Sequence, residues 1–250
     1  MRALWALTRA EGRLYLREPM NVFFGLVFPT LLIFMLGFLI PAMQETVPGE
    51  PGFADLRIID LFAPIILALA IATVSLTTLP PVFGSYRERG VLRRLSTTPL
   101  PASRLLIAQV AVNVAAVVVA VALALVGGVA LLDLALPTQP LLVVGAFLLA
   151  AVEMISLGCL ISAVVPTAAG ASGLGMVLYF PMLFFAGVWL PGPLMPAGLA
   201  QVSGWTPLGA ASQAMTEGWF GSGVPVQQLV VMVIWTLVLV PLAARLFRWS

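Results

Sequence analysis

The sequence predicts an all-α integral membrane protein with six transmembrane helices. Of its 250 residues, 61% are hydrophobic and 9% are charged, whereas about 25% of the residues in a soluble domain are charged. The few charges are separated by long apolar stretches. If these stretches cross a membrane, the charged residues are distributed unevenly between its two sides. We expect a single transmembrane domain over residues 1–250.

The uncharged stretches have the length of membrane-crossing helices. A bilayer core about 30 Å thick requires about 20 apolar residues in a helix. Glu18 is followed by 26 uncharged residues, and Arg104 is followed by 28. Applied along the whole chain, this criterion predicts spans at residues 21–41, 60–83, 105–131, 141–164, 170–190 and 224–244.

The segment 191–216 is apolar but contains many helix-breaking residues. Its prolines and glycines are Pro191, Gly192, Pro193, Pro196, Gly198, Gly204, Pro207 and Gly209. Backbone exposed to lipid must satisfy its own hydrogen bonds, so an interrupted helix is tolerated only at the interface or buried against other helices. We therefore expect re-entrant outer half-helices between spans five and six.

The arginines test the number of spans independently. With a cytoplasmic N-terminus and six spans, eleven of the twelve arginines lie in cytoplasmic segments, as the positive-inside rule requires. Only Arg57 lies outside. A seventh span at 191–216 would place Arg245 and Arg248 on the outer side. Both termini are therefore predicted to be cytoplasmic.

Two residue types that carry much enzyme chemistry are absent, because the sequence contains no lysine and no histidine. A P-loop requires a lysine after its second glycine, so this chain cannot hold that ATP site. Ser-His-Asp catalysis and histidine-ligated metal sites are excluded as well. The lone Cys159 can form no intrachain disulfide. We expect a chain that is not an enzyme and binds no metal or cofactor.

Residues 1–20 predict an amphipathic helix. Arginines lie on one side of a helical projection and leucines on the other, namely Arg2, Arg9 and Arg13 against Leu4, Leu7 and Leu14. Such a helix lies in the membrane interface. Glu11 and Glu18 interrupt the leucine side. The alternative is a positively charged flank that only sets the topology.

The loop 84–104 is the most charged part of the chain, with six of the 22 charges in 21 residues. Residues Tyr86–Leu95 predict a short helix that Pro99 and Pro101 end. A loop that only obeys the positive-inside rule requires no apolar residues, but Val91, Leu92 and Leu95 are interleaved with the arginines. This pattern favours a helix that docks on a protein partner. The alternative is a purely topogenic turn.

Glu153 is the one charge well inside a predicted span. A carboxylate at that depth costs about 2.5–3.5 kcal/mol on insertion scales, so it should face protein or water. It can serve as a substrate or proton site, or it can bond a neighbouring helix through Gln109, Asn113 or Thr73. Gln109 and Asn113 lie on one face of span three, which favours interhelical packing.

Spans two and five carry residues that alter helix shape and packing. Pro80 and Pro81 should kink span two. The hydroxyls that precede them are expected to bond backbone carbonyls four residues back; these are Thr73, Ser75, Thr77 and Thr78. Span five contains Ala171 and Gly175 at a spacing that permits close helix contact.

Two stretches resemble the type-2 ABC transporter permeases. The phrase SYRERGVLRRLSTTPLPASRLLIAQ at 85–109 is similar to the family's arginine-rich turn before span three. The phrase PMLFFAGVWLPGPLMPAGLAQVSGWTPLGAASQAM at 181–215 resembles its span-five end and outer half-helices. Trp205-Thr206-Pro207 departs from the pattern, because many relatives have Asn before this proline. The daunorubicin-exporter type of drug permease is the most similar subgroup.

The resemblance implies a half-transporter in a bacterial plasma membrane. Two copies would assemble with two separate ATP-binding subunits that hold ATP and Mg, and would export an amphipathic drug-like or lipid-like compound, as in drug efflux and antibiotic resistance. Spans one and five would form the dimer seam, with Ala171 and Gly175. The residues that would couple to the ATPase are Tyr86, Arg87, Glu88, Arg89, Val91, Leu92, Arg93, Arg94 and Leu95.

Two other functions remain open from the sequence. The chain could be the permease of a polysaccharide or glycolipid exporter of the same architecture, although those permeases usually carry a longer N-terminal amphipathic segment. It could also be a membrane scaffold that transports nothing. An adjacent reading frame that encodes an ATPase would distinguish a transporter from a scaffold.

Overall fold

A computed structural model describes residues 2–47, 53, 55–96 and 103–246. Six helical segments in this part of the chain are long and apolar enough to cross a membrane, which confirms the predicted number. They are Pro19–Leu39, Ile58–Glu88, Arg104–Leu132, Pro140–Val164, Ala168–Ala186 and Val226–Leu246. The described residues form no strand, apart from an isolated bridge between Thr46 and Arg57.

The first three spans include several helical pieces. Helix α1 (Arg2–Arg17) precedes span one, which consists of α2 (Pro19–Val22), η1 (Phe23–Val27) and α3 (Phe28–Leu39). The short η2 (Pro41–Gln44) follows. Span two consists of η3 (Ile58–Leu61), α4 (Phe62–Ala72), η4 (Thr73–Thr78) and α5 (Leu79–Glu88). Helix α6 (Val91–Ser96) leads to span three, α7 (Ser103–Leu132).

The second half of the chain forms three further spans and a group of short helices. Spans four and five are α8 (Pro140–Val164) and α9 (Ala168–Ala186), and span six is α12 (Val226–Leu246). Between spans five and six lie η5 (Gly192–Leu194), α10 (Ala197–Ser203) and α11 (Pro207–Phe220).

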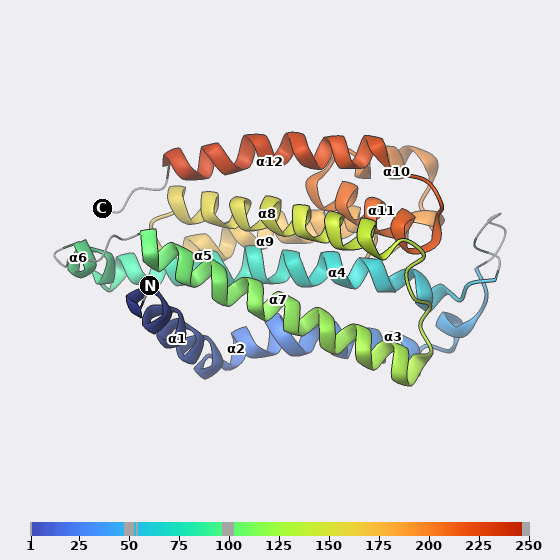
Figure 1. Ribbon diagram of the computed structural model, residues 1–250, viewed down its shortest axis with the longest axis horizontal. Coiled ribbons are helices and arrows are strands. Elements are labelled where there is room, and N and C mark those ends of the chain that lie inside the picture. Colours follow the sequence, from blue (N-terminus) through green and yellow to red (C-terminus); the bar gives the residue numbers. More distant parts are fainter. Residues whose placement is uncertain (1, 48–52, 54, 97–102, 247–250) are drawn as a thin grey trace.

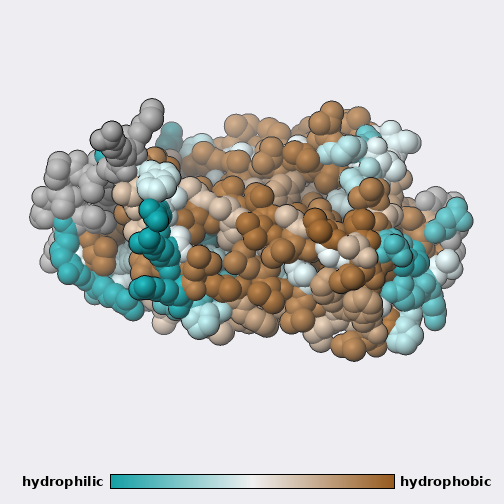
Figure 2. All heavy atoms as spheres, turned by 60° about the horizontal axis from the view of Figure 1, so that its bottom comes forward, coloured by the Kyte–Doolittle hydropathy of each residue, from teal (hydrophilic) through white to brown (hydrophobic). Residues whose placement is uncertain are grey.

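The spans lie lengthwise beside one another (Figure 1). Helices α1 and α6 lie at one end of this bundle, which we call the arginine-rich end, and α10 and α11 lie at the opposite end. Figure 2 shows a hydrophobic band along the middle of the surface, with hydrophilic groups gathered toward the two ends. This distribution is typical of a bundle that crosses a membrane.

Span two is the centre of the bundle. Of its most apolar stretch, 94% is buried, whereas the corresponding value for the other five spans is between 22% and 44%. Every residue of α4 is buried. A helix that is apolar on all sides can be enclosed by other helices without burying polar groups.

Spans one and two each contain a π-helical segment before a proline. Segment η1 precedes Pro29, and η4 precedes Pro80 and Pro81. Proline has no N–H to donate, so the normal hydrogen-bond pattern cannot continue through it. The altered winding in η4 lies where the sequence predicts a kink.

Two of the predicted hydroxyl-to-backbone bonds are present in span two. Thr73 donates to the Leu69 carbonyl at 2.7 Å, and Thr77 donates to the Thr73 carbonyl at 2.6 Å. The buried Ser75 hydroxyl has no hydrogen-bond partner among the described residues. The back-bonding prediction is therefore wrong for Ser75.

A glycine explains the difference at two of the predicted helix boundaries that differ from the structure. Span five ends at Ala186 because Gly187 adopts the left-handed conformation, with φ +93°. The single helix predicted over Tyr86–Leu95 is divided at Gly90, whose φ is +65°. Glycine adopts this conformation without steric cost. The predicted terminators Pro99 and Pro101 lie outside the described residues.

The segment after span five folds into the opposite end of the bundle. Helix α11 begins where the Thr206 hydroxyl accepts a hydrogen bond from the Gly209 N–H at 3.2 Å. The Ser203 and Ser212 hydroxyls donate to the last carbonyls of span five, each at 2.6 Å. Most of α11 is buried. These contacts explain how a segment with many prolines remains compact beside the spans.

Candidate functional site

The arginine-rich end joins α5 to α6 through a tight turn. The predicted coupling residues Tyr86, Arg87 and Glu88 form the last turn of span two and thus belong to α5 rather than to a separate loop helix. Arg89 and Gly90 form the turn, and the remaining predicted residues belong to α6. Movement of α6 would therefore act directly on the end of span two.

One side of α5 holds α1 and span three together. Tyr86 donates a hydrogen bond to the Glu11 carboxylate at 2.5 Å, and Gln109 donates to the same oxygen at 2.5 Å. Glu11 and Gln109 are both buried. We call these three residues the Glu11 cluster. It connects the N-terminal helix, the end of span two and the start of span three.

The environment of Glu11 shifts the pKa of its carboxyl group upward. Burial raises the pKa of Glu11 above 4.5, and the hydrogen bonds from Tyr86 and Gln109 oppose that rise by stabilising the carboxylate. Burial has the larger effect. The cluster is therefore sensitive to the charge state of a single side chain.

The other side of α5 holds the turn between spans four and five. The Arg87 guanidinium donates to the carbonyls of Ser162 and Val165. The Glu88 carboxylate accepts a hydrogen bond from the Ala168 N–H at 3.1 Å. A Cβ added at Gly84 would lie 2.5 Å from the Ala168 nitrogen. Span two thus contacts four neighbouring elements at this end.

One of the apolar residues of α6 that were predicted to contact a partner is buried within the chain. Leu92 was expected to contact a protein partner, but it is only 3% exposed and packs within the chain. Val91 is half-buried and Arg94 is exposed. Arg93 and Leu95 also belong to α6, and their side chains lie outside the described part. Of the expected contact residues described here, Val91 therefore supplies the apolar surface.

The polar residues predicted to bond Glu153 form no hydrogen bond with its carboxylate oxygens. Glu153 is fully buried, and neither carboxylate oxygen has a hydrogen-bond partner among the described residues. Its three expected partners are engaged elsewhere. Gln109 bonds Glu11, the Asn113 amide donates to the Gln109 carbonyl at 2.7 Å, and the Thr73 hydroxyl lies 2.8 Å from that of Tyr179.

The small residues of span five contact span two of the same chain. Ala171 and Gly175 are both buried. A Cβ added at Gly175 would lie 2.2 Å from the Leu76 carbonyl oxygen of span two, which is too close for a side chain. Span four approaches span two in the same way, because a Cβ added at Gly158 would lie 2.1 Å from the Ser75 carbonyl oxygen. The structure therefore corrects the assignment of Ala171 and Gly175 to the dimer seam, since no surface of either is available to a second copy.

A cavity of about 620 Å³ lies between spans one, two and five. Its walls are mainly apolar and aromatic, and they include Phe24, Phe28, Tyr179, Phe180 and Trp189. Hydroxyl groups of span two, such as that of Thr77, contribute polar atoms to the cavity wall. The sequence alone could not place span one opposite the aromatic residues of span five.

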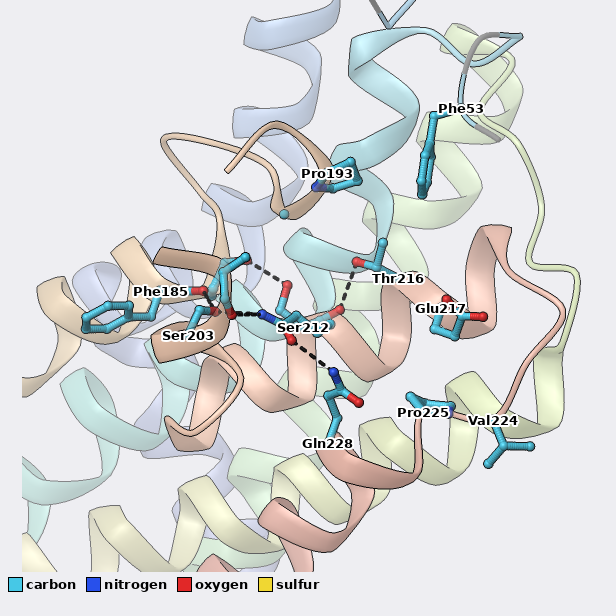
Figure 3. Close-up of a pocket in the computed structure, with 14 residues that line it drawn as sticks. Phe53, Phe185, Pro193, Ser203, Ser212, Thr216, Glu217, Val224, Pro225 and Gln228 are labelled. Carbon is cyan, nitrogen blue, oxygen red and sulfur yellow. Dashed lines mark hydrogen bonds between the residues drawn. The ribbon is translucent and has the colours of Figure 1, made fainter. Parts of the chain in front are cut away.

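A second cavity, of about 330 Å³, lies at the opposite end between α11 and span six (Figure 3). Polar groups form part of its wall. Gln228 donates to Gln213 at 3.1 Å and Thr216 donates to the Ser212 carbonyl at 2.8 Å. The cavity therefore combines a polar wall with apolar residues such as Phe185 and Val224.

Arg57 connects several elements at the end of the bundle that is opposite the arginine-rich end. It pairs with Asp60 at 3.0 Å, and it donates to the carbonyls of Leu132 and Asp133 at 2.8 Å and 2.9 Å. It also donates to Gln44 at 3.0 Å. The one arginine predicted on the outer side thus connects the ends of spans one, two and three.

The chain belongs to the family of ABC-2 type transporters, whose membrane domain matches residues 2–220.. The match covers the Glu11 cluster, α6, the large cavity and the first five spans. No curated protein matches the chain.

Membership of this family gives the class of protein. The chain is a multi-pass membrane protein and a permease component of an ABC transporter. Such a component is a transport subunit that typically catalyses no reaction itself, and it generally works with an ATP-binding subunit.

Proposed function

We propose that the chain is the permease subunit of an exporter that moves an amphipathic drug-like or lipid-like compound across a bacterial plasma membrane. A separate subunit hydrolyses the ATP. The cavity between spans one, two and five supports an amphipathic cargo, because it combines aromatic walls with a few hydroxyls. A polysaccharide would require many more polar groups along its path.

The distribution of arginines supports an orientation. With the arginine-rich end in the cytoplasm, α6 faces the compartment that contains ATP, and α1 lies at the inner interface. The helices α10 and α11 then form a re-entrant segment on the outer side. Both termini are cytoplasmic in this arrangement.

The observation that carries the proposal is the position of span two. This helix continues from the turn before α6 to the wall of the large cavity, where Thr73, Thr77 and Pro81 lie. At its arginine-rich end it bonds α1, span three and the turn between spans four and five. A displacement of α6 by the ATPase would therefore reach both the cavity wall and the neighbouring spans.

A second copy of the chain would complete the transporter. Spans one and five carry large exposed apolar side chains, including Phe23, Phe24, Val177 and Phe180. We propose that these exposed faces form the seam in place of the buried Ala171 and Gly175. The large cavity would then adjoin the seam.

The experiment measures how tightly ATP hydrolysis is coupled to transport. Tyr86→Phe removes the hydroxyl that bonds Glu11, and a hydrogen bond of about 1 kcal/mol changes the equilibrium constant for docking of α1 by about fivefold. In proteoliposomes with the ATPase, this variant should hydrolyse ATP but transport fewer molecules per ATP. Ser156→Ala removes an exposed hydroxyl of span four and serves as the control. An unchanged ratio in an assembled Tyr86→Phe complex would contradict the coupling role.

A further inference from the structure

A third cavity lies between spans three, four and six. Its volume is about 710 Å³, and it shares no lining residue with the large cavity between spans one, two and five. The buried side chains of Ile155 and Cys159 form its floor. Val114, Leu148 and Val240 also line it and are exposed at its rim. We call it the lateral groove, because it opens on the surface of the bundle that would face lipid.

The lateral groove suits a hydrocarbon chain. Apart from Cys159 and Ser156, all of its lining side chains are aliphatic. The Ser156 hydroxyl already donates to the Val152 carbonyl of its own helix at 2.6 Å. From Leu148 to Cys159 the helix rises about 16 Å, and the hydrocarbon layer of one leaflet is about 15 Å deep. A single acyl chain therefore matches the groove in both chemistry and length.

Two arginines flank the groove where it reaches the arginine-rich end. The start of span three and the ends of spans four and six lie at this end of the bundle (Figure 1). Arg104 lies two residues before the lining residue Leu106. Arg245 directly follows the lining residue Ala244. Because Leu106 and Ala244 line one cavity, both arginines lie near the same end of it.

Both guanidinium groups are available to a ligand. Arg104 is half-buried and Arg245 is exposed. Neither forms a hydrogen bond or an ion pair with another described residue. The long side chains of arginines at the ends of spans extend into the headgroup layer. A lipid whose acyl chain fills the groove would therefore place its phosphate between two unpaired positive charges.

We propose that the lateral groove binds an anionic phospholipid, with one acyl chain between spans three and six and the phosphate beside Arg104 and Arg245. Basic groups between the ends of transmembrane helices bind anionic lipid headgroups. A zwitterionic head carries a cationic group as well, which weakens its attraction to two guanidinium groups. The bound lipid fills a gap between three spans and is not cargo.

A helix of a second copy is the other occupant that an apolar membrane groove could hold. The exposed aromatic side chains that we assign to the seam belong to spans one and five, as Phe24 and Phe180 do. The lateral groove has no aromatic lining residue. An apolar helix would also leave Arg104 and Arg245 without a partner, whereas a phosphate pairs with both. The observations therefore favour a lipid.

Two photoreactive phospholipids test the proposal. Both carry the same acyl chain with a diazirine, and one has a phosphatidylglycerol head whereas the other has a phosphatidylcholine head. The full chain is held in nanodiscs of phosphatidylcholine that contain a trace of one probe. Labelling of span four (Pro140–Val164) is normalised to labelling of span five (Ala168–Ala186), which contributes no residue to the groove.

We expect the phosphatidylglycerol probe to label span four about fourfold more than the phosphatidylcholine probe, because each exposed charge contact contributes about twofold. Replacing both Arg104 and Arg245 with Gln should abolish this preference, and replacing both with Lys should keep it. Arg17→Gln removes an exposed arginine from the end of α1 and should have no effect. Equal labelling by the two probes, or a preference that survives the double Gln variant or is lost in Arg17→Gln, would overturn the proposal.

A second pair of variants tests the position of the acyl chain. Ala244→Phe adds a ring at an exposed position that lines the groove, and it should reduce labelling of span four by both probes because the ring occupies the volume of the chain. Ala122→Phe adds the same ring to an exposed position of span three outside the groove and is the control. Equal labelling of these two variants would contradict the proposal. No ATP or ATPase is present, so the result does not depend on the proposed function.

Discussion

Glu11 explains an irregularity in the N-terminal helix. In the sequence this residue interrupts the apolar side of an amphipathic pattern. In the structure it is buried and bonded to Tyr86 and Gln109. The sequence indicates that Glu11 requires a hydrogen-bond partner, because an acidic residue among leucines cannot be buried without one at low cost. It does not identify the partners, because Tyr86 and Gln109 lie 75 and 98 residues away in the chain.

The raised pKa of Glu11 predicts a pH dependence. Because burial raises this pKa above 4.5, the folded chain binds the proton more tightly than the unfolded chain does. The resulting stabilisation is complete below about pH 4.5 and is lost as the pH rises through the raised value. Glu11→Gln lacks this proton. The stability of the parent chain relative to Glu11→Gln should therefore fall as the pH rises above about 4.5.

Thermal unfolding of both proteins in detergent at several pH values measures this difference. Tyr86 and Gln109 bond the carboxyl, and Glu18 and Arg89 line the same cavity as Glu11; all four are the same in both proteins. A difference that stayed constant across the range would show that Glu11 does not titrate as a buried group.

Glu153 differs from Glu11 because no hydrogen-bond partner is present. The sequence predicts a bond to a neighbouring helix, but both carboxylate oxygens are buried without one. A buried polar group without a partner costs about 1–3 kcal/mol. Glu153→Met should therefore raise the unfolding temperature by at least about 2 °C.

Glu153→Gln is the matched control, because it keeps two buried polar atoms and should give no gain. The unfolding temperature of purified protein in detergent decides the outcome. A Glu153→Met protein that is less stable than its parent would indicate that the carboxyl has a stabilising partner, such as a bound ion or a second copy.

At the scale of the elements, the sequence predicts the number of spans better than their arrangement. Length and charge determine where a helix can cross a bilayer, and these properties are visible in the sequence. The central position of span two is not visible. Lipid and a protein interior are both apolar, so Phe62–Ala72 could face either. The same ambiguity led to the assignment of Ala171 and Gly175 to the seam.

Glycines of spans four and five adjoin the π-helical segment of span two. The Ser75 and Leu76 carbonyls face Gly158 and Gly175 at distances that exclude a Cβ. We expect Gly175→Ala to destabilise the chain by about 1–3 kcal/mol, because the two backbones would have to separate. Gly158→Ala should have a similar effect.

Gly173→Ala is a suitable control, since a Cβ at this position would meet no atom within 4 Å. Thermal unfolding and yield of folded protein measure the effect. Equal stability of Gly175→Ala and Gly173→Ala would show that spans two and five are not in close contact in the membrane.

At the scale of the whole molecule, the structure connects three regions that the sequence leaves separate. The turn before α6, the Glu11 cluster and one wall of the large cavity all belong to span two or bond to it. The sequence indicates α6 as a docking helix from its interleaved arginines and apolar residues. It could not show that Leu92 is buried, because residues on one short helix can pack on the chain or face a partner.

The central claim is that α6 receives an ATP-binding subunit. Val91 is the suitable residue for a test, because it is half-buried. Leu92→Asp would introduce a charge into the chain's own packing and would disturb α6 itself. A charge at an interface hot spot costs about 2 kcal/mol or more. Leu136→Asp introduces the same charge at an exposed position of the opposite end and is the control.

The most direct measurement is the amount of ATP-binding subunit that copurifies with each variant from membranes in which the chain is correctly inserted. We predict that Val91→Asp loses most of its ATPase and that Leu136→Asp retains it. Full retention of the ATPase by a folded, correctly inserted Val91→Asp protein would contradict the account.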